Sequence, residues 1–172
     1  MGGDDRDSEL RRLFEDHWSA LCRLAFLMLG DRAGAEECVQ DAYLGVFRAW
    51  DRVRTMDRPD LYLRTAVVNR CRSRLRRRRL ERRPPVADPP GAGPESANAE
   101  PGDAGVRDEV LTVVRRLPAR QRAAVILRYY EDRSEAEIAA ALDCSTGTVK
   151  SQLAKARATL RRALGPHAGD DV

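Results

Sequence analysis

Residues 134–157 read SEAEIAAALDCSTGTVKSQLAKAR, and this pattern predicts two helices joined by a tight turn. Ser134 stands three positions before a glutamate, which is the capping-box pattern of a helix start. Asp143 and Cys144 turn the chain, and Ser145 is suited to cap a second helix. Two helices with a turn of about three residues between them form a helix-turn-helix. The stretch therefore predicts an element that binds DNA.

The second of these helices has a polar face that suits a DNA groove. Its inward stripe is expected to consist of Val149, Leu153, Ala156, Leu160 and Leu164, and the polar side chains lie off that stripe. In a helix-turn-helix the second helix enters the major groove, where Lys reaches phosphate or guanine and Gln pairs with adenine. A solvated face without a partner is the alternative interpretation, and the net positive charge of the region argues against it. The residues predicted to bind DNA here are Ser145, Thr148, Lys150, Ser151, Gln152, Ala154, Lys155 and Arg157.

Charge is unevenly distributed along the chain of 172 residues, whose formal net charge is +4. Residues 1–63 contain 9 basic and 13 acidic residues, whereas residues 64–83 contain 10 arginines and one glutamate. Residues 106–164 contain 12 basic and 7 acidic residues. Two separate basic regions predict contact with a polyanion at two places, and the acidic N-terminal region predicts a different partner.

A segment rich in proline and glycine divides the chain. Residues 84–105 contain six Pro and four Gly in 22 positions, and Val86 is their only large apolar residue. Such a segment cannot bury itself, so it is predicted to be a flexible, acidic linker. It separates an N-terminal domain, residues 8–83, from a C-terminal domain, residues 106–164, with residues 165–172 as a tail.

The N-terminal domain reads as three helices and the C-terminal domain as four, so the predicted fold class is all-α. The first helix is expected to follow Asp7 or Ser8 and to end at Gly30, and the second to begin after Asp31. A loop over about 51–58 and a third helix over about 59–81 follow, with Pro59 in its first turn. The expected inward residues are Leu10, Leu13, Phe14, Leu21, Leu24, Ala25 and Met28 on the first helix, and Ala35, Cys38, Val39, Ala42, Tyr43, Val46 and Phe47 on the second.

Metal binding, cofactor binding and catalysis find little support in the composition. The two histidines, His17 and His167, lie beside an apolar stripe and in the tail, and the four cysteines have no CxxC spacing. An enzyme such as a resolvase with a C-terminal helix-turn-helix would need an α/β domain and an activated nucleophile. Neither is evident, so no catalytic residue, metal or cofactor is predicted.

The same composition argues against a membrane protein. No run of 18 apolar residues occurs, and the N-terminus MGGDDRDSEL is acidic and lacks the apolar stretch of a signal peptide. We therefore expect a cytoplasmic protein without membrane insertion.

Three stretches together carry a resemblance to a known family. They are AEECVQDAYLGVFRAW at 35–50, RPDLYLRTAVVNRCRSRLRRRR at 58–79, and the segment 117–157, which begins LPARQRAAVILRYYEDR. Over residues 8–164 the chain resembles the extracytoplasmic-function (ECF, group 4) sigma factors of bacterial RNA polymerase, in an actinobacterial-type subgroup. The resemblance implies that the two predicted domains are sigma region 2 and sigma region 4.

This resemblance implies a function without catalysis. Such proteins bind core RNA polymerase, through the clamp helices of the β′ subunit and the flap of the β subunit, and recognise promoter DNA. Region 2 recognises and helps to melt the −10 element, and region 4 recognises the −35 element. The linker would thread the polymerase cleft, and an anti-sigma factor is a common partner in the family.

The resemblance also implies site residues in region 2. Asn69 and the loop after Trp50 would hold an unstacked promoter base, with a pocket offsetting the cost of unstacking. The polymerase-binding residues would be Glu37, Gln40, Asp41, Leu44 and Arg48. The −10 DNA-binding residues would be Trp50, Val53, Tyr62, Ala66, Asn69, Arg70, Arg74, Arg76, Arg77 and Arg78.

Some positions depart from the family pattern, among them the small Ala154 and the loop after Trp50, which has few aromatic residues, and one alternative function stays open. Gln152 stands where many relatives have Arg, and Asp143 stands where the turn often has Gly, although Asp tolerates a left-handed backbone. The alternative is a stand-alone helix-turn-helix transcriptional regulator. That function would leave the polar face within 35–48 and the acidic linker without a role.

Overall fold

The computed structural model describes residues 3–81 and 106–165, and within these ranges it contains helices and no strands. The all-α prediction is therefore confirmed. The predicted linker, residues 84–105, and residues 166–172 of the predicted tail lie outside the described residues.

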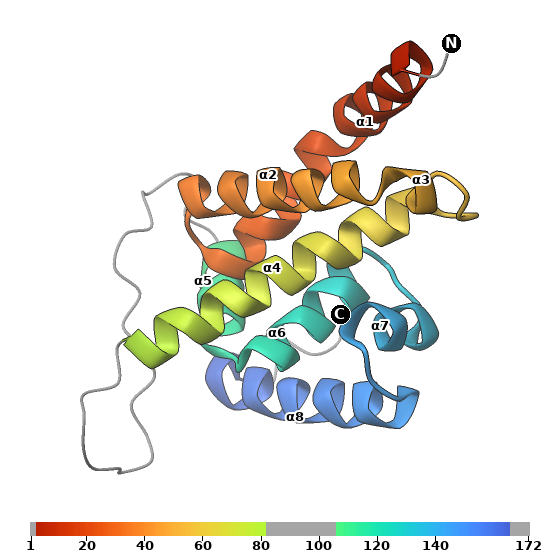
Figure 1. Ribbon diagram of the computed structural model, residues 1–172. Helices are drawn as coiled ribbons and strands as arrows, with labels where there is room; N and C mark the ends of the chain where they lie inside the picture. The colour runs from red at the N-terminus through yellow and green to blue at the C-terminus, as the bar shows by residue number, and fades with distance from the viewer. Residues whose placement is uncertain (1–2, 82–105, 166–172) are drawn as a thin grey trace. The chain divides into compact units, whose positions relative to one another are not determined.

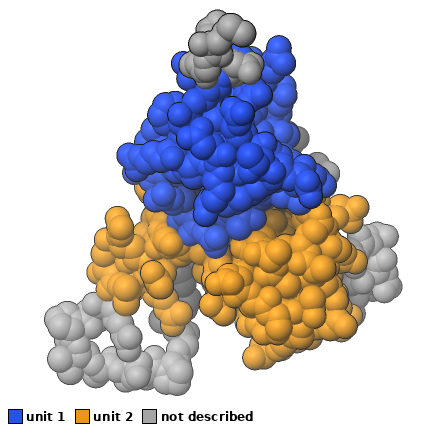
Figure 2. Space-filling model, turned by 45° about the vertical axis from the view of Figure 1, so that its right-hand side comes forward, with its two compact units in different colours: residues 1–71 blue, residues 72–172 orange. Residues whose placement is uncertain are grey.

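Within each described range, the helices follow one another along the chain with short connections (Figure 1). Two compact units are present, residues 1–71 and residues 72–172, and the division falls inside the long helix that ends at Glu81 (Figure 2). The elements are α1 (Gly3–Leu29), α2 (Arg32–Arg48), α3 (Trp50–Val53), α4 (Pro59–Glu81), α5 (Val106–Arg116), α6 (Ala119–Val125), the π-helix η1 (Ile126–Tyr130), α7 (Glu135–Leu142) and α8 (Thr146–Leu164).

The core of the first unit is built on the packing of α1 against α2. Small residues on the buried side of α2, such as Ala35 and Ala42, allow a close approach of the two helices. The predicted stripes are largely confirmed, because Leu10, Leu21, Leu24, Ala25 and Met28 of α1 and Ala35, Cys38, Val39, Ala42, Tyr43 and Val46 of α2 are buried. The core is completed by Val53, Leu63, Val67, Val68 and Cys71.

Two aromatic residues that were expected to face inward are exposed instead. Phe14 stacks on Trp18, with the ring centroids 4.7 Å apart, and lies 4.5 Å from the ring of Tyr43. Phe47 is 50% exposed, and the guanidinium of Arg6 lies 5.2 Å from its ring centroid. Because these rings find partners at the surface, the prediction that they join the core was wrong.

Helix α1 begins earlier than the capping pattern at Asp7 and Ser8 predicts. It starts at Gly3, and Arg6 donates a hydrogen bond of 2.9 Å to the carbonyl of Phe47 at the end of α2. This tertiary contact satisfies a carbonyl of the last turn of α2, and it stabilises the additional turn of α1.

The other predicted boundaries of this unit agree with the structure, apart from the loop over 51–58. Gly30, with φ 73°, ends α1, and the Asp31 side chain caps α2 by accepting from the Gly34 amide at 3.2 Å. Pro59 begins α4 as predicted. The expected loop over 51–58 instead opens with the short helix α3.

In the second unit α8 packs against α5, α6 and α7, and three of its predicted inward residues, Val149, Leu153 and Ala156, are buried. Leu160 and Leu164, which were also expected to face inward, lie toward the C-terminal end of the helix and are only half-buried. The capping box at Ser134 is present, with the Glu137 amide donating to Ser134 Oγ at 3.3 Å. Asp143 has the left-handed conformation, φ 50° and ψ 61°, that the turn requires. The helix-turn-helix prediction is confirmed in each of its parts.

A buried arginine fixes the corner between α5 and α6. The guanidinium of Arg122 donates hydrogen bonds to the carbonyl of Arg115, in the last turn of α5, and to that of Leu117, which directly follows the helix. Burial, and then the neighbouring charge of Arg115, lowers the pKa of Arg122 to about 10. The side chain acts as a cap for α5 across the break at Pro118.

We predict that Ser134→Ala destabilises the second unit by about 1 kcal/mol, because it removes the acceptor of the α7 cap. Hydrogen exchange of the α7 amides in the full chain, compared with Ser151→Ala as a control inside α8, measures this loss. The backbone and side-chain hydrogen bonds from Ser134 lower the pKa of Glu137. The ionised carboxylate of Glu137 therefore stabilises the folded unit through its hydrogen bonds from Ser134. This stabilisation is present above the ordinary pKa of a glutamate and is lost as the pH falls through the lowered pKa of Glu137. Equal protection in the two variants would contradict the role of the cap.

Candidate functional site

The DNA-facing surface predicted on α8 is presented to solvent. Lys150, Ser151, Ala154, Lys155 and Arg157 are exposed, because the 3.6-residue period places them off the buried stripe. Of the remaining predicted residues of this surface, Ser145 is exposed, and Thr148 and Gln152 are half-buried.

The hydroxyl of Ser145 is already engaged at the helix start. It accepts a hydrogen bond of 3.1 Å from the Thr148 amide and lies 3.0 Å from the Thr148 hydroxyl. These bonds fix the first turn of α8, so both residues shape the surface as well as lie on it.

Two side chains from other elements hold two of the three cations of this surface, and neither was predicted from the sequence. Glu135, the first residue of α7, has its Oε2 atom 3.7 Å from Lys150 Nζ. Tyr129 accepts a hydrogen bond of 2.8 Å from Arg157 Nε through its hydroxyl. We call Lys150 with Glu135, and Arg157 with Tyr129, the two restrained cation pairs.

The position of Tyr129 depends on the π-helix η1. The Glu131 amide donates to the Ile126 carbonyl at 3.2 Å, which is a bond between residues five apart. Such a turn shifts the following side chains relative to an α-helix and often occurs at functional sites. The sequence predicts a continuous helix over 119–132 and gives no sign of this turn.

The face of α4 predicted to contact DNA carries Tyr62, Ala66 and Asn69. Their spacing places them on one side of the helix, with Asn69 exposed and the other two half-buried. Arg52, which follows Trp50 on α3, donates to the Tyr62 hydroxyl at 2.9 Å and lies 5.7 Å from the ring centroid. Tyr62 is therefore held in place from outside its own helix.

The loop before α4 is tied to the start of that helix. Arg58 makes two hydrogen bonds with the Asp60 carboxylate, at 3.1 and 3.0 Å. Those hydrogen bonds are the main reason that the pKa of Asp60 is lowered. The loop thus has a charged anchor beside the first turn of α4.

Trp50 and Val53, which were expected at the −10 DNA, lie in the core. The Nε1 atom of Trp50 is buried and has no hydrogen-bond partner within the described part of the chain. A shallow hollow lies at this indole, lined by Glu9, Leu13, Asp16, Trp50, Arg54 and Pro59. The hollow combines carboxylates with a guanidinium.

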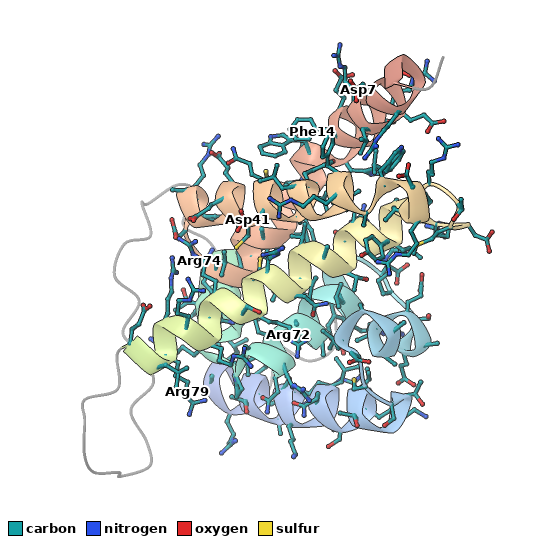
Figure 3. The ribbon with its side chains drawn as sticks, in the orientation of Figure 1. Asp7, Phe14, Asp41, Arg72, Arg74 and Arg79 are labelled. Carbon is teal, nitrogen blue, oxygen red and sulfur yellow. The ribbon has the colours of Figure 1, made fainter. Side chains whose placement is uncertain are left out.

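The predicted arginines of α4 differ in exposure. Arg70, Arg76 and Arg77 are exposed, and Arg74 and Arg78 are half-buried. The guanidinium of Arg70 lies over Gly45 of α2, 3.7 Å from where a Cβ atom would be. Figure 3 shows the side chains of Arg74 and Arg79 projecting from the C-terminal half of α4. The result is a cationic end of the helix with three neighbouring exposed arginines, Arg76, Arg77 and Arg79.

The polymerase-binding face predicted on α2 forms one exposed stripe. Glu37, Gln40, Asp41, Leu44 and Arg48 are all exposed, and their spacing follows one side of the helix. Leu44 is 53% exposed and adds apolar area to this charged face. Phe47 continues this stripe one turn beyond Leu44 and was missed as a surface residue, although its spacing from Gln40 and Leu44 is the signal that could have found it.

Other classes of site find no support in the described ranges. Residues 3–81 and 106–165 contain no group of three or more His, Cys, Asp or Glu placed to hold a metal ion. None of the helices in these ranges is long and apolar enough to cross a membrane.

Two family models match this chain, one in each half. Residues 13–81 match the family model for Sigma-70 region 2, and residues 107–160 match that for Sigma-70, region 4. The ECF RNA polymerase sigma factor SigM of Mycobacterium tuberculosis is 36% identical over 154 residues, which cover 90% of this chain and 76% of SigM. The RNA polymerase sigma-E factor of Streptomyces avermitilis is 34% identical over 145 residues, which cover 84% of this chain and 79% of that protein.

A solved structure gives the same assignment. The sigma factor RpoE of Bartonella quintana, determined in complex with the anti-sigma factor NepR, aligns with a TM-score of 0.69 and 27% identity. The alignment covers 94% of this chain and 98% of RpoE. Since both sigma regions match in order and the relatives exceed 30% identity over most of their length, this chain belongs to the ECF sigma factors of RNA polymerase.

Proposed function

We propose that this protein binds core RNA polymerase and directs promoter-specific initiation by recognising −10 and −35 elements and melting DNA. The observation that carries the proposal is the outward face of α8, held over a buried stripe in a complete helix-turn-helix. Core RNA polymerase is the proposed partner because this chain belongs to the ECF sigma factors of RNA polymerase. The same family consists of initiation factors, which supports a function without catalysis and a place in the cytoplasm with the polymerase.

For the −35 element the proposed contacts are those of α8. Lys150, Ser151 and Gln152 lie near the N-terminal end of the helix, which in a helix-turn-helix approaches base edges. Arg157 lies further along, and its hydrogen bond to Tyr129 directs the guanidinium while leaving its charge available for phosphate. These roles are supported by exposure and by the helical register.

For the −10 element the proposed site is the exposed side of α4 with the loop before it. Asn69 offers an amide for base contact, and Tyr62, held by Arg52, offers a ring for stacking. We assign Trp50 and Val53 an indirect role, because their buried side chains shape the loop. Arg54, which is exposed at the rim of the hollow, offers a guanidinium to a base or phosphate that approaches the loop.

For the polymerase the proposed contact is the α2 stripe. Leu44 supplies apolar area at its centre, and the surrounding charges supply orientation. RpoE of Bartonella quintana was solved with an anti-sigma factor, and we include a protein of that class among the partners of this chain.

Leu44→Ala should weaken binding to core polymerase by at least about tenfold, because a Leu side chain buried in an interface contributes roughly 1.5–3 kcal/mol, which is roughly 10- to 150-fold. The matched control is Leu80→Ala, which truncates another exposed leucine, 62% accessible, on α4. Titration of labelled chain with core polymerase measures both variants. The proposed function is contradicted if the wild-type chain does not associate with core polymerase at all, and the assignment of the α2 stripe is contradicted if both variants bind like the wild type.

Replacing Arg76, Arg77 and Arg79 with Gln should weaken promoter complexes to a similar degree for all sequences. Each lost phosphate contact lowers the slope of log K against log salt by about 0.9. The control replaces Arg11, Arg12 and Arg23, three exposed arginines of α1, in the same way. An unchanged salt slope in the α4 variant would show that this cationic end does not touch phosphate.

Lys150→Ala and Ser151→Ala should change the preference of the holoenzyme for −35 sequences while leaving its affinity for core polymerase intact. A good contact to a base edge is worth about 1–3 kcal/mol of discrimination, which is roughly 5- to 150-fold. Sequencing of the start sites made by each holoenzyme measures the preference. If a variant loses polymerase binding together with promoter preference, the variant is misfolded. That result would contradict the role of these residues in recognising the −35 sequence.

A further inference from the structure

The ion pair between Glu135 and Lys150 joins the two helices of the helix-turn-helix on its DNA-facing side. Lys150 keeps 68% of its side chain exposed and Glu135 keeps 39%, so DNA can reach both residues. An ion pair this exposed contributes little to stability. Its position at the surface that meets the groove therefore points to a role in binding.

Lys150 differs from the other cations of this surface. Arg157 is held by the neutral hydroxyl of Tyr129, and Lys155 has no carboxylate within ion-pair distance among the described residues. Within that part of the chain, the carboxylate of Glu135 thus offsets the charge of one selected cation of α8, the one nearest the N-terminal end of the helix.

The consequences of this pairing differ between a phosphate and a base edge. An ammonium group has three donors, so Lys150 can donate to an uncharged base acceptor, such as guanine O6 or N7, and keep its carboxylate partner. If Lys150 instead turns to a phosphate, a second anion is brought next to Glu135. The repulsion between the two anions opposes that contact.

We propose that Glu135 is a specificity-determining residue of −35 recognition, which directs Lys150 toward base edges and opposes binding that depends on phosphate alone. This inference rests on the proposed function. Glu135 acts through Lys150 and is a positioning residue. It lowers the affinity for arbitrary DNA and raises the ratio between matched and unmatched −35 sequences.

The test uses Glu135→Gln in the full chain assembled with core polymerase. Dissociation constants are measured over a range of salt for a promoter selected by the wild-type holoenzyme, and for the same duplex with its −35 element scrambled. We expect the variant to bind the scrambled duplex about two- to fivefold more tightly. For that duplex, the slope of log K against log salt should be steeper by the amount expected for about one phosphate contact. The ratio between the affinities for the selected and the scrambled promoter should fall correspondingly.

Two controls separate this effect from net charge and from helix stability. Glu109→Gln removes one exposed carboxylate from α5 and should leave discrimination unchanged. In a Lys150→Gln background, Glu135→Gln should have no further effect on discrimination, because the pair no longer exists. Unchanged discrimination in the single variant, an equal change with Glu109→Gln, or a full effect without Lys150 would each overturn the inference. A wild-type holoenzyme that ignores the −35 sequence would instead overturn the proposed function.

Discussion

The burial of one apolar stripe on α8 determines which side chains can meet DNA. Val149, Leu153 and Ala156 are buried against the three preceding helices, and full burial of a Val or Leu side chain is worth roughly 1.5–3 kcal/mol. A rotation of α8 by one residue, about 100°, would turn a buried aliphatic side chain toward water and Lys150 toward the core. The cost of that rotation exceeds the worth of any single polar contact on the outer face, so the core of this unit sets the DNA-facing surface.

Local signals were sufficient to predict most of the fold, whereas a contact between residues far apart in the chain was not predicted. Several signals act only on the adjacent backbone: Ser134 caps α7, Gly30 adopts a positive φ, and Pro59 starts α4 with its fixed φ. Because these effects are local, the sequence alone reveals them. Phe47 was placed in the core because its spacing fits the buried stripe. It is exposed instead, and Arg6, 41 positions away in the chain, lies over its ring and donates to its carbonyl. Helical periodicity contains no information about such a contact.

The same distinction applies to the site. The outward residues of α8 could be predicted because they are the complement of a periodic stripe, and the exposed face of α2 could be predicted for the same reason. The two residues that hold the cations of α8 could not. Tyr129 and Arg157 are 28 positions apart, and their contact depends on a π-turn whose extra residue no propensity reveals. Glu135 was visible as a first-turn acid of α7, but its partner is defined only by how α7 packs on α8.

The two restrained cations have opposite electrostatic consequences, although the physical device is similar. Fixing a long cationic side chain removes part of the entropy cost of ordering it on DNA. Tyr129 does this with a neutral hydroxyl, so Arg157 keeps its full charge and its attraction to any phosphate. Glu135 does it with a carboxylate, so Lys150 is attracted less by phosphate, while its donors still fit a base edge. Nonspecific affinity grows with net charge, whereas discrimination grows with oriented donors. Helix α8 therefore combines a cation that favours phosphate, Arg157, with a cation that favours base edges, Lys150. The two differ because a neutral hydroxyl holds one and a carboxylate holds the other, and the identity of the cation is not the cause.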